Sequence, residues 1–335
     1  MKIQGVQIIG TQRSGSNLLR VILNQSDQVV SPHPAHLLTN FVPLLPHYGV
    51  LDTMSYRRLV EDVVDYIHVN PVDWGIRLDK DEIYEMTSQF SLFELNKTIY
   101  EFLARQKGAT YWCCKSMGNV YFADELENVS PHLKYVYLYR DGRDVALSFQ
   151  KAMVGEKHSY HIARQWHKDQ QACLKLCSRL TSDRLFMLKY EQLIQQPERI
   201  IRQLCEFLGI GFQNKMLDYY ASDESRRTAE GGAMWTNLTK PVMKDNCNKF
   251  MSEMTTEDIR IFESVAFDSL EALGYQPLTP RSELLRFTPE DVTRFNVQNE
   301  QRKRGFVAPD EDLRKRKPQL DLINRIRDAE VNMHG

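Results

Sequence analysis

Residues 6–23 read VQIIGTQRSGSNLLRVIL, an apolar run, a loop with two glycines, and a second apolar run. The run over residues 6–9 predicts a strand, and the stretch from Asn17 to about Leu23 predicts a helix. Gly10 and Gly15 lie five apart in the loop, where glycine permits positive φ and a close backbone approach. Successive N–H groups of such a loop, with a helix dipole behind them, form a phosphate cradle.

The same loop separates two kinds of phosphate binder. A kinase that uses ATP and magnesium has G-x-x-x-x-G-K-S/T, in which Lys reaches the outer phosphates and Ser or Thr binds the metal. This chain has Ser16 and Asn17 at those two positions, and its cation lies within the loop as Arg13. An ATP-dependent kinase therefore remains an alternative. This chain, however, lacks the Lys and the Ser or Thr with which such a kinase holds its phosphates and its metal. A glycine turn with an exposed arginine is the structural alternative.

A second strand, loop and helix follow in residues 135–149, which read YVYLYRDGRDVALSF. The strand is predicted over residues 135–139 and the helix from about Asp144. Arg140 and Ser148 can then converge on one phosphate, which a guanidinium binds bidentately. Asp141 and Asp144 would repel an anion, so we expect them to cap the helix or orient the arginines.

Further strands and helices alternate along the chain. A strand over residues 185–188 precedes an amphipathic helix that Gly209 ends, and helical periodicity covers residues 56–68 and 92–105. This alternation predicts an α/β fold with a parallel sheet covered on both faces. Residues 281–335 are 40% charged against 26% overall, so we expect a charged, mostly helical C-terminal extension over residues 279–335. Its functional alternatives are an oligomer contact or a lid.

Composition excludes several classes. Among 335 residues, 43 Lys and Arg face 44 Asp and Glu, which argues against a nucleic-acid-binding protein. None of the six cysteines forms a C-x-x-C pair, and no metal site is predicted. No signal-peptide core or membrane span is evident, so the expected location is cytoplasmic.

Together these motifs resemble the sulfotransferase superfamily, and most closely its bacterial members related to tyrosylprotein sulfotransferases. Members transfer a sulfuryl group from 3′-phosphoadenosine-5′-phosphosulfate (PAPS) to an acceptor, usually a hydroxyl, and release adenosine 3′,5′-bisphosphate (PAP). The resemblance implies a P-loop-type three-layer α/β/α domain with a central parallel sheet over residues 1–278. GTQRSGSNLLR resembles the 5′-phosphosulfate loop, and YRDGRDVALSF resembles the 3′-phosphate motif.

Three other segments extend the resemblance. The segment that begins KYEQL resembles one whose Tyr lies near the nucleoside, here Tyr190. The segment MWTNLTKPVMKDNCNKF resembles the loop that closes over the cofactor and brings Lys240 and Lys249 to it. In CCKSMGN, Lys115 occupies the position of a transition-state lysine. The implied cofactor-binding residues are Arg13, Ser14, Gly15, Ser16, Asn17, Arg140, Ser148, Tyr190, Lys240 and Lys249, and Arg13 and Lys115 are also implied to be catalytic.

The catalytic base is where the chain departs from this family. Tyrosylprotein members have Glu shortly after the first helix, whereas this chain reads SPHPAH over residues 31–36. Imidazole titrates near neutral pH and suits a general base. His33 is the expected base and His36 the alternative, while His158 and His161 are candidates to reach the acceptor.

The acceptor stays open among carbohydrate, lipid, peptide and small molecule, and a homo-oligomer is one option for the assembly. A nucleotide-binding sensor without turnover is the alternative from another class. An enzyme, unlike such a sensor, needs Lys115 and a histidine in one cleft.

Overall fold

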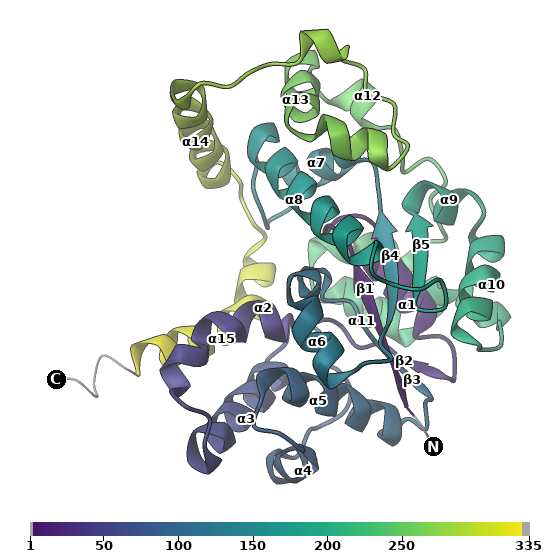
Figure 1. The fold of residues 1–335 in the computed structure, drawn as a ribbon, viewed down its shortest axis with the longest axis vertical. Coiled ribbons are helices and arrows are strands. Elements are labelled where there is room, and N and C mark those ends of the chain that lie inside the picture. Colours follow the sequence, from purple (N-terminus) through teal and green to yellow (C-terminus); the bar gives the residue numbers. More distant parts are fainter. Residues whose placement is uncertain (1–2, 330–335) are drawn as a thin grey trace.

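The computed structural model describes residues 3–329 and is built around one parallel sheet (Figure 1). The strand order is β2-β3-β1-β4-β5, and every pairing is parallel. The strands are β1 (Gln4–Ile9), β2 (Val29–Val30), β3 (Tyr111–Cys114), β4 (Lys134–Tyr139) and β5 (Leu185–Lys189). All five carboxyl ends therefore meet at the same edge of the sheet.

Side chains alternate between the two faces of the strands and make two cores. In β4, Tyr135 and Tyr137 join one buried cluster, while Val136 and Leu138 join the other. Such alternation of apolar side chains is the pattern of a sheet buried on both faces. The architecture is the predicted three-layer α/β/α arrangement.

Helices cover both faces. The first face carries α2 (Leu37–Phe41), α3 (Thr53–His68), α4 (Lys80–Met86), α5 (Leu92–Gln106), α6 (Ala123–Val129), α7 (Gly142–Gln150), α8 (Ser159–Cys177) and α13 (Thr256–Ala272). The second carries α1 (Ser16–Leu23), α9 (Tyr190–Gln195), α10 (Pro197–Leu208) and the 3-10 helix η5 (Ala233–Thr239). The short helices α11 (Asp223–Glu230) and α12 (Phe250–Glu253) pack against η5 and α7, respectively.

The predicted elements are present, with two differences. Helix α7 begins at Gly142 rather than near Asp144, because the Asp141 carboxylate accepts the Arg143 N–H and caps it early. Strands β2 and β3 were not predicted, since two and four residues are too short to give a clear period. Gly209 ends α10 with φ 72°, as expected.

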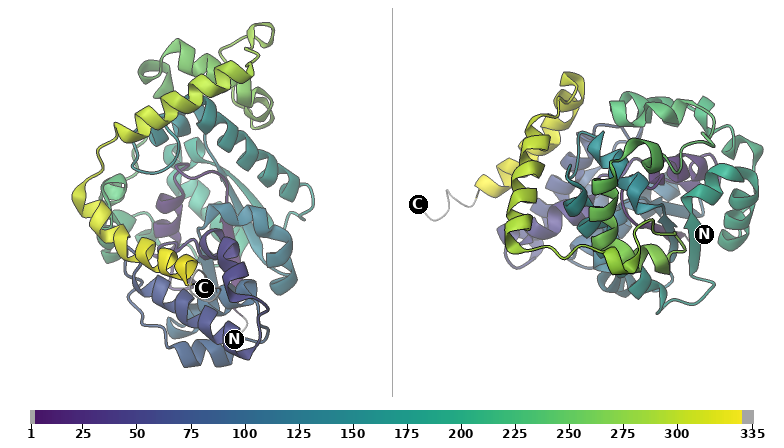
Figure 2. Two further views of the ribbon diagram at one scale, coloured as in Figure 1. Left: turned by 90° about the vertical axis from the view of Figure 1, so that its left-hand side faces the viewer. Right: turned by 90° about the horizontal axis from the view of Figure 1, so that it is seen from above.

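The charged extension contains α14 (Pro289–Arg304) and α15 (Asp310–Asp328), while its last six residues lie outside the described range. Phe295 of α14 packs against Tyr160 and Ile261, and α15 contributes apolar side chains to the first core. The connection between α14 and α15 runs down one side of the molecule, from the region of α8 to the region of α3 (Figures 1 and 2). Within residues 3–329, no helix combines the length and apolar content needed to cross a bilayer.

Candidate active site

A cavity of about 420 Å³ opens at the carboxyl edge of the sheet. Ligands of open α/β sheets bind at this edge, where strand connections diverge. The predicted site residues that line the cavity are Arg13, Gly15, Ser16, Asn17, His33, His36, Lys115, Arg140, Ser148, Tyr190 and Lys249. Ser14, within the loop, is fully buried, and Lys240 is exposed outside the cavity.

The loop after β1 has the backbone of an anion cradle. Gly10, Arg13 and Gly15 have φ of 136°, 72° and 88°. A Cβ on Gly10 would lie 2.1 Å from the Leu138 carbonyl oxygen, and one on Gly15 would lie 2.4 Å from the Tyr190 ring. The first turn of α1 contains no acidic side chain, so its N–H groups and dipole can act on an anion.

The two motifs predicted to bind anions meet directly. Arg13 Nε donates to Ser148 Oγ over 3.1 Å, and Arg140 Nη1 donates to the Arg13 carbonyl oxygen over 3.2 Å. Burial, with a smaller effect of the Arg140 charge, lowers the pKa of Arg13 to about 10, so its guanidinium is charged at neutral pH. Strands β1 and β4 are neighbours, which explains why loops 135 residues apart form one site.

Arg140 is held beside an aromatic ring. Its guanidinium lies 4.6 Å from the centroid of Tyr190, and its Nη2 donates to the Asn246 carbonyl oxygen over 2.9 Å. Asn246 Nδ2 also donates to the Tyr190 hydroxyl over 2.8 Å. The Nε of Arg140 is buried without a hydrogen-bond partner among the described residues, and such an N–H suits an anionic ligand.

Asp141 acts as expected, whereas Asp144 lies 3.7 Å from Arg140 Nη2 but also lines the cavity. Asp141 pairs with Arg143, whose guanidinium also reaches Glu263 of α13 at 2.6 Å. Asp144 accepts the backbone N–H groups of Asn248 and Phe250, at 2.7 and 3.0 Å. These contacts hold the loop that carries Lys249 against α7.

Lys115 follows β3 and lies on the floor of the cavity, only 6% exposed. Gln7 Nε2 donates to the carbonyl oxygens of Cys114 and Ser116, at 3.0 and 3.1 Å, and so fixes the backbone on either side of it. Burial, followed by the charges of Arg20 and Arg13, lowers the pKa of Lys115 to about 7. An anion in the cavity would restore its charge.

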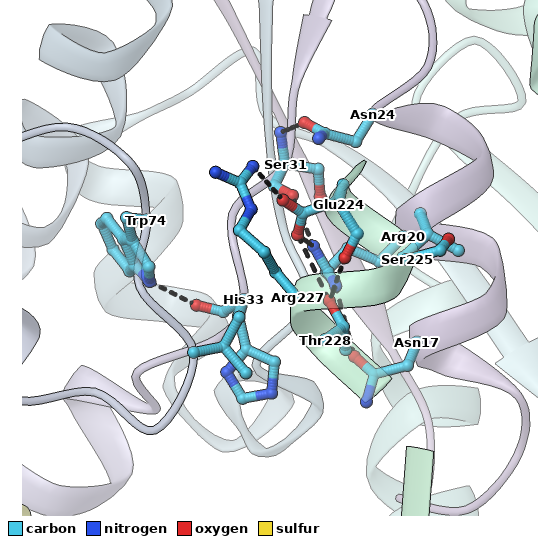
Figure 3. Close-up of polar contacts among 12 residues, drawn as sticks. Asn17, Arg20, Asn24, Ser31, His33, Trp74, Glu224, Ser225, Arg227 and Thr228 are labelled. Atoms are coloured by element: carbon cyan, nitrogen blue, oxygen red, sulfur yellow. Dashed lines mark hydrogen bonds and ion pairs between the residues drawn. The ribbon is translucent and has the colours of Figure 1, made fainter. Parts of the chain in front are cut away.

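A buried ion pair supports the segment that carries the histidines (Figure 3). Arg20 of α1, fully buried, binds Glu224 of α11 at 2.5 Å and donates to the Ser31 carbonyl oxygen over 3.0 Å. Trp74 Nε1 donates to the His33 carbonyl oxygen over 2.7 Å. The backbone around His33 is therefore held from two sides.

The hydrogen bonds of the His33 ring determine its tautomer. Asn70 Nδ2 donates to the Val72 carbonyl oxygen over 2.9 Å, which requires this side of the amide to be the NH₂ group. The same NH₂ lies 3.2 Å from His33 Nδ1, which must then accept. Neutral His33 carries its proton on Nε2, a buried atom with no partner among the described residues. This tautomer offers a donor, not a base, at Nε2.

His36 lies at the start of α2 with φ 55° and also lines the cavity. Burial, followed by the charges of Lys115 and Arg316, lowers its pKa to about 3. Its imidazole is therefore neutral throughout the physiological range, and a pKa this low makes it a weaker base than the near-neutral imidazole expected from the sequence. By contrast, His158 caps α8 and stacks on Phe295 of α14, and neither His158 nor His161 lines the cavity.

Met234 and Trp235 of η5, which begin the segment expected to close over the cofactor, line the cavity. Two basic cavity residues, Lys151 and Arg316, were not expected from the sequence. With these, six basic side chains and two acidic ones line the described cavity, which suits a polyanion. Arg316 lies in the RKRKP cluster, where no local signal distinguishes one arginine from its solvated neighbours.

A phosphate cradle at the carboxyl edge of a parallel sheet, joined to a second arginine site, defines an anion-binding α/β protein of the P-loop type. Residues 5–214 match the model described as "Sulfotransferase family", and the chain belongs to that family.

Curated relatives agree with this assignment. The chain is 21% identical to a protein-tyrosine sulfotransferase of Drosophila melanogaster, over 80% of this chain and 51% of that protein. It is 23% identical to protein-tyrosine sulfotransferase 1 of Danio rerio, over 80% of this chain and 71% of that protein. An uncharacterized Aquifex aeolicus protein is 25% identical over 66% of this chain and 28% of its own length. The chain thus spans about half of the length of the Drosophila relative and 28% of the length of the Aquifex one.

Two solved structures have a similar fold. The sulfotransferase domain from the Synechococcus PCC 7002 olefin synthase has a TM-score of 0.55 at 21% identity, over 83% of this chain and 97% of that one. The sulfotransferase domain from the curacin biosynthetic pathway has a TM-score of 0.50 at 23% identity, over 92% of this chain and 100% of that one.

Proposed function

We propose that this protein is a sulfotransferase that takes a sulfuryl group from PAPS and transfers it to a hydroxyl group of an acceptor. One observation carries the proposal: Lys115 and the two histidines line the same cavity as both anion-binding motifs. A protein that only bound the nucleotide would need the motifs but neither of those groups.

The cavity residues fit a nucleotide with phosphate at both ends. Arg13 and the N–H groups of residues 13–17 would hold the 5′ end, at the start of α1. Arg140 and Ser148 would hold the 3′-phosphate with Lys249, and Tyr190 would flank the nucleoside. Arg140 Nε and the positive lining support this fit. We leave Lys240 out of the set because its side chain is exposed outside the cavity.

The chain's own groups then have separate tasks. PAPS, when bound, supplies the sulfuryl group and a phosphate that leaves. Lys115 and Arg13 neutralise negative charge near the 5′ end, where sulfuryl transfer, like phosphoryl transfer, develops charge on the leaving oxygen. His36 accepts the proton of the acceptor hydroxyl. The Nε2–H group of His33 donates a hydrogen bond to the ligand bound in the cavity.

The kinase alternative has less support. Ser16 and Asn17 line the cavity at the positions where a kinase has its phosphate-binding Lys and metal-binding Ser or Thr. The sensor alternative does not account for Lys115 and His36 beside the anion motifs.

Thermal-shift measurements with PAP, and with ATP plus magnesium, test the cofactor. We expect stabilisation by PAP at micromolar concentrations and little by ATP. Transfer of ³⁵S from labelled PAPS into members of an acceptor panel tests the activity. Stabilisation by ATP with magnesium but not by PAP would overturn the proposal in favour of a kinase. PAP binding without any turnover across the panel would favour a sensor.

A further inference from the structure

Helix α15 brings a basic side chain from the C-terminal extension into the cavity. Arg316 lines it together with His33, His36 and Trp235. None of the predicted phosphate-binding motifs includes this residue, which follows Lys249, the last predicted cofactor-binding residue, by 67 positions in the chain.

Contacts on either side of Arg316 hold the helix in position. One turn before it, the buried Asp312 carboxylate accepts the Ala233 N–H of η5, at 3.1 Å. One turn after it, Gln319 Nε2 donates to Asn70 Oδ1 over 3.3 Å, and Asn70 is the residue that contacts His33. Leu322, Ile323 and Ile326 anchor the rest of α15 in the first core. Arg316 is thus placed by a docked helix rather than by a surface tail.

One N–H group of the Arg316 guanidinium has no partner in the described protein, although the nearby Asp312 charge opposes the effect of burial on the Arg316 pKa. Its Nε is buried and has no hydrogen-bond partner among the described residues. Its carbon centre lies 5.5 Å from the Trp235 ring, and the His33 ring lies 4.6 Å from that same ring. The nearby Asp312 carboxylate is engaged with the η5 backbone. A buried N–H of a charged group without a partner calls for an anionic ligand.

Arg316 lies on the histidine side of the cavity. Its guanidinium and the His33 ring contact the same Trp235 ring, and Gln319, one turn further along α15, donates to the Asn70 side chain that contacts His33. Burial lowers the pKa of His33 and His36, and the Arg316 charge adds to this effect. An acceptor hydroxyl beside the histidines would therefore lie on the same side of the cavity as Arg316.

We propose that Arg316 binds an anionic group of the acceptor, so that the preferred acceptor is a hydroxyl compound that also carries a carboxylate or a phosphate. This rests on the proposed function, because it assigns the opposite end of the cavity to the nucleotide. A planar guanidinium binds either group through two parallel hydrogen bonds, which would also orient the hydroxyl toward His36.

Matched probes test the proposal on the full chain saturated with PAP. One pair is 4-hydroxyphenylacetate with its neutral amide, and the other is glycerol 3-phosphate with glycerol. Calorimetry measures their binding to the wild type and to R316M, R316K and K317M. Lys317 is the control, since its ammonium pairs with Asp321 on the exposed face of the same helix.

We expect at least one charged probe to bind the wild type at least about tenfold more tightly than its neutral partner, and R316M to lose this preference. R316K should retain part of it, more for the phosphate than for the carboxylate, because Lys lacks the planar fork. K317M should behave as the wild type. The 4-hydroxyphenylacetate pair tests for a carboxylate on the acceptor, and the glycerol 3-phosphate pair tests for a phosphate.

Two failures are distinguishable. If PAP itself does not bind the wild type, the proposed function is wrong. If PAP binds but neither pair shows a charge preference, or R316M keeps it, the role of Arg316 is wrong while the sulfotransferase proposal stands. If R316M does not fold, R316K decides, and an unchanged carboxylate preference in that variant would overturn the inference.

Discussion

Arg13 and Ser148 are joined by a hydrogen bond of 3.1 Å between side chains from two different strand–loop–helix units. The phosphate loop and the segment of residues 140–148 therefore line one continuous surface of the cavity. Arg140 strengthens this link by donating to the Arg13 carbonyl oxygen.

Replacing Ser148 by Ala should weaken PAP binding by about 30-fold. A hydrogen bond to a charged group contributes about 2 kcal/mol, and here the hydroxyl would donate to the 3′-phosphate. Calorimetry with PAP and with adenosine 5′-monophosphate, which lacks the 3′-phosphate, measures the effect. S178A, at an exposed position after α8, is the control. Equal losses for both nucleotides would contradict the 3′-phosphate assignment.

Nucleotide binding should take up a proton at Lys115. Burial holds the pKa of Lys115 near 7 in the free protein, and nearby phosphate oxygens would raise it. Affinity for PAP should therefore fall as pH rises from 7 to 9, by up to about tenfold per unit. Calorimetry in buffers of different ionisation enthalpy counts the protons directly. K115M should abolish the uptake, and an uptake unchanged in K115M would assign it to another group.

Replacing His36 by Ala should lower kcat by about 10²- to 10⁴-fold with little change in PAP affinity, because it removes a general base and no phosphate contact. The low pKa of His36 keeps it neutral down to about pH 4, so activity should not fall between pH 8 and 5 through loss of this base. His33→Ala should cost less, since His33 supplies a hydrogen bond. The reverse order of the two variants would return the base role to His33.

Gly15→Ala should destabilise the protein by at least about 1–2 kcal/mol and abolish PAP binding. The added Cβ occupies a left-handed conformation and collides with the Tyr190 ring at 2.4 Å. Gly209 is the matched control, with φ 72° and nothing within 4 Å of an added Cβ. G209A should lose similar backbone energy but bind PAP normally. Urea denaturation and calorimetry on both variants test this, and normal PAP binding by G15A would contradict it.

Arg20→Met should lower the free energy of unfolding by about 3 kcal/mol, because it leaves Glu224 with only its more exposed partner Arg227 and the Ser31 carbonyl without a donor. Arg226 forms an exposed pair with Asp223 on the same helix as Glu224, and R226A should cost less than about 1 kcal/mol. Urea denaturation compares the two. Similar small losses would mean that the buried pair adds little to stability.

The local elements were predictable because their signals are local. The strand before Gly10, the helix stopped by Gly209 and the caps of the RDGRD motif depend on neighbours within a few residues. Strands β2 and β3 were missed for the opposite reason, since Val29 and Tyr111 owe their strand conformation to pairing with each other across 82 positions. The resemblance to sulfotransferases supplied Lys115, which no spacing rule would single out.

By itself, the sequence determined the anion loop, the α/β architecture and the family, since glycine positions, alternating periods and motif order lie along the chain. Only the tertiary structure decided which side chains share the cavity. It excluded His158 and Lys240, admitted Arg316 from the charged extension, and assigned the proton of His33 through Asn70. The physical reason is that burial and hydrogen-bond direction depend on atoms brought together from distant segments, and a single sequence carries no local record of that arrangement.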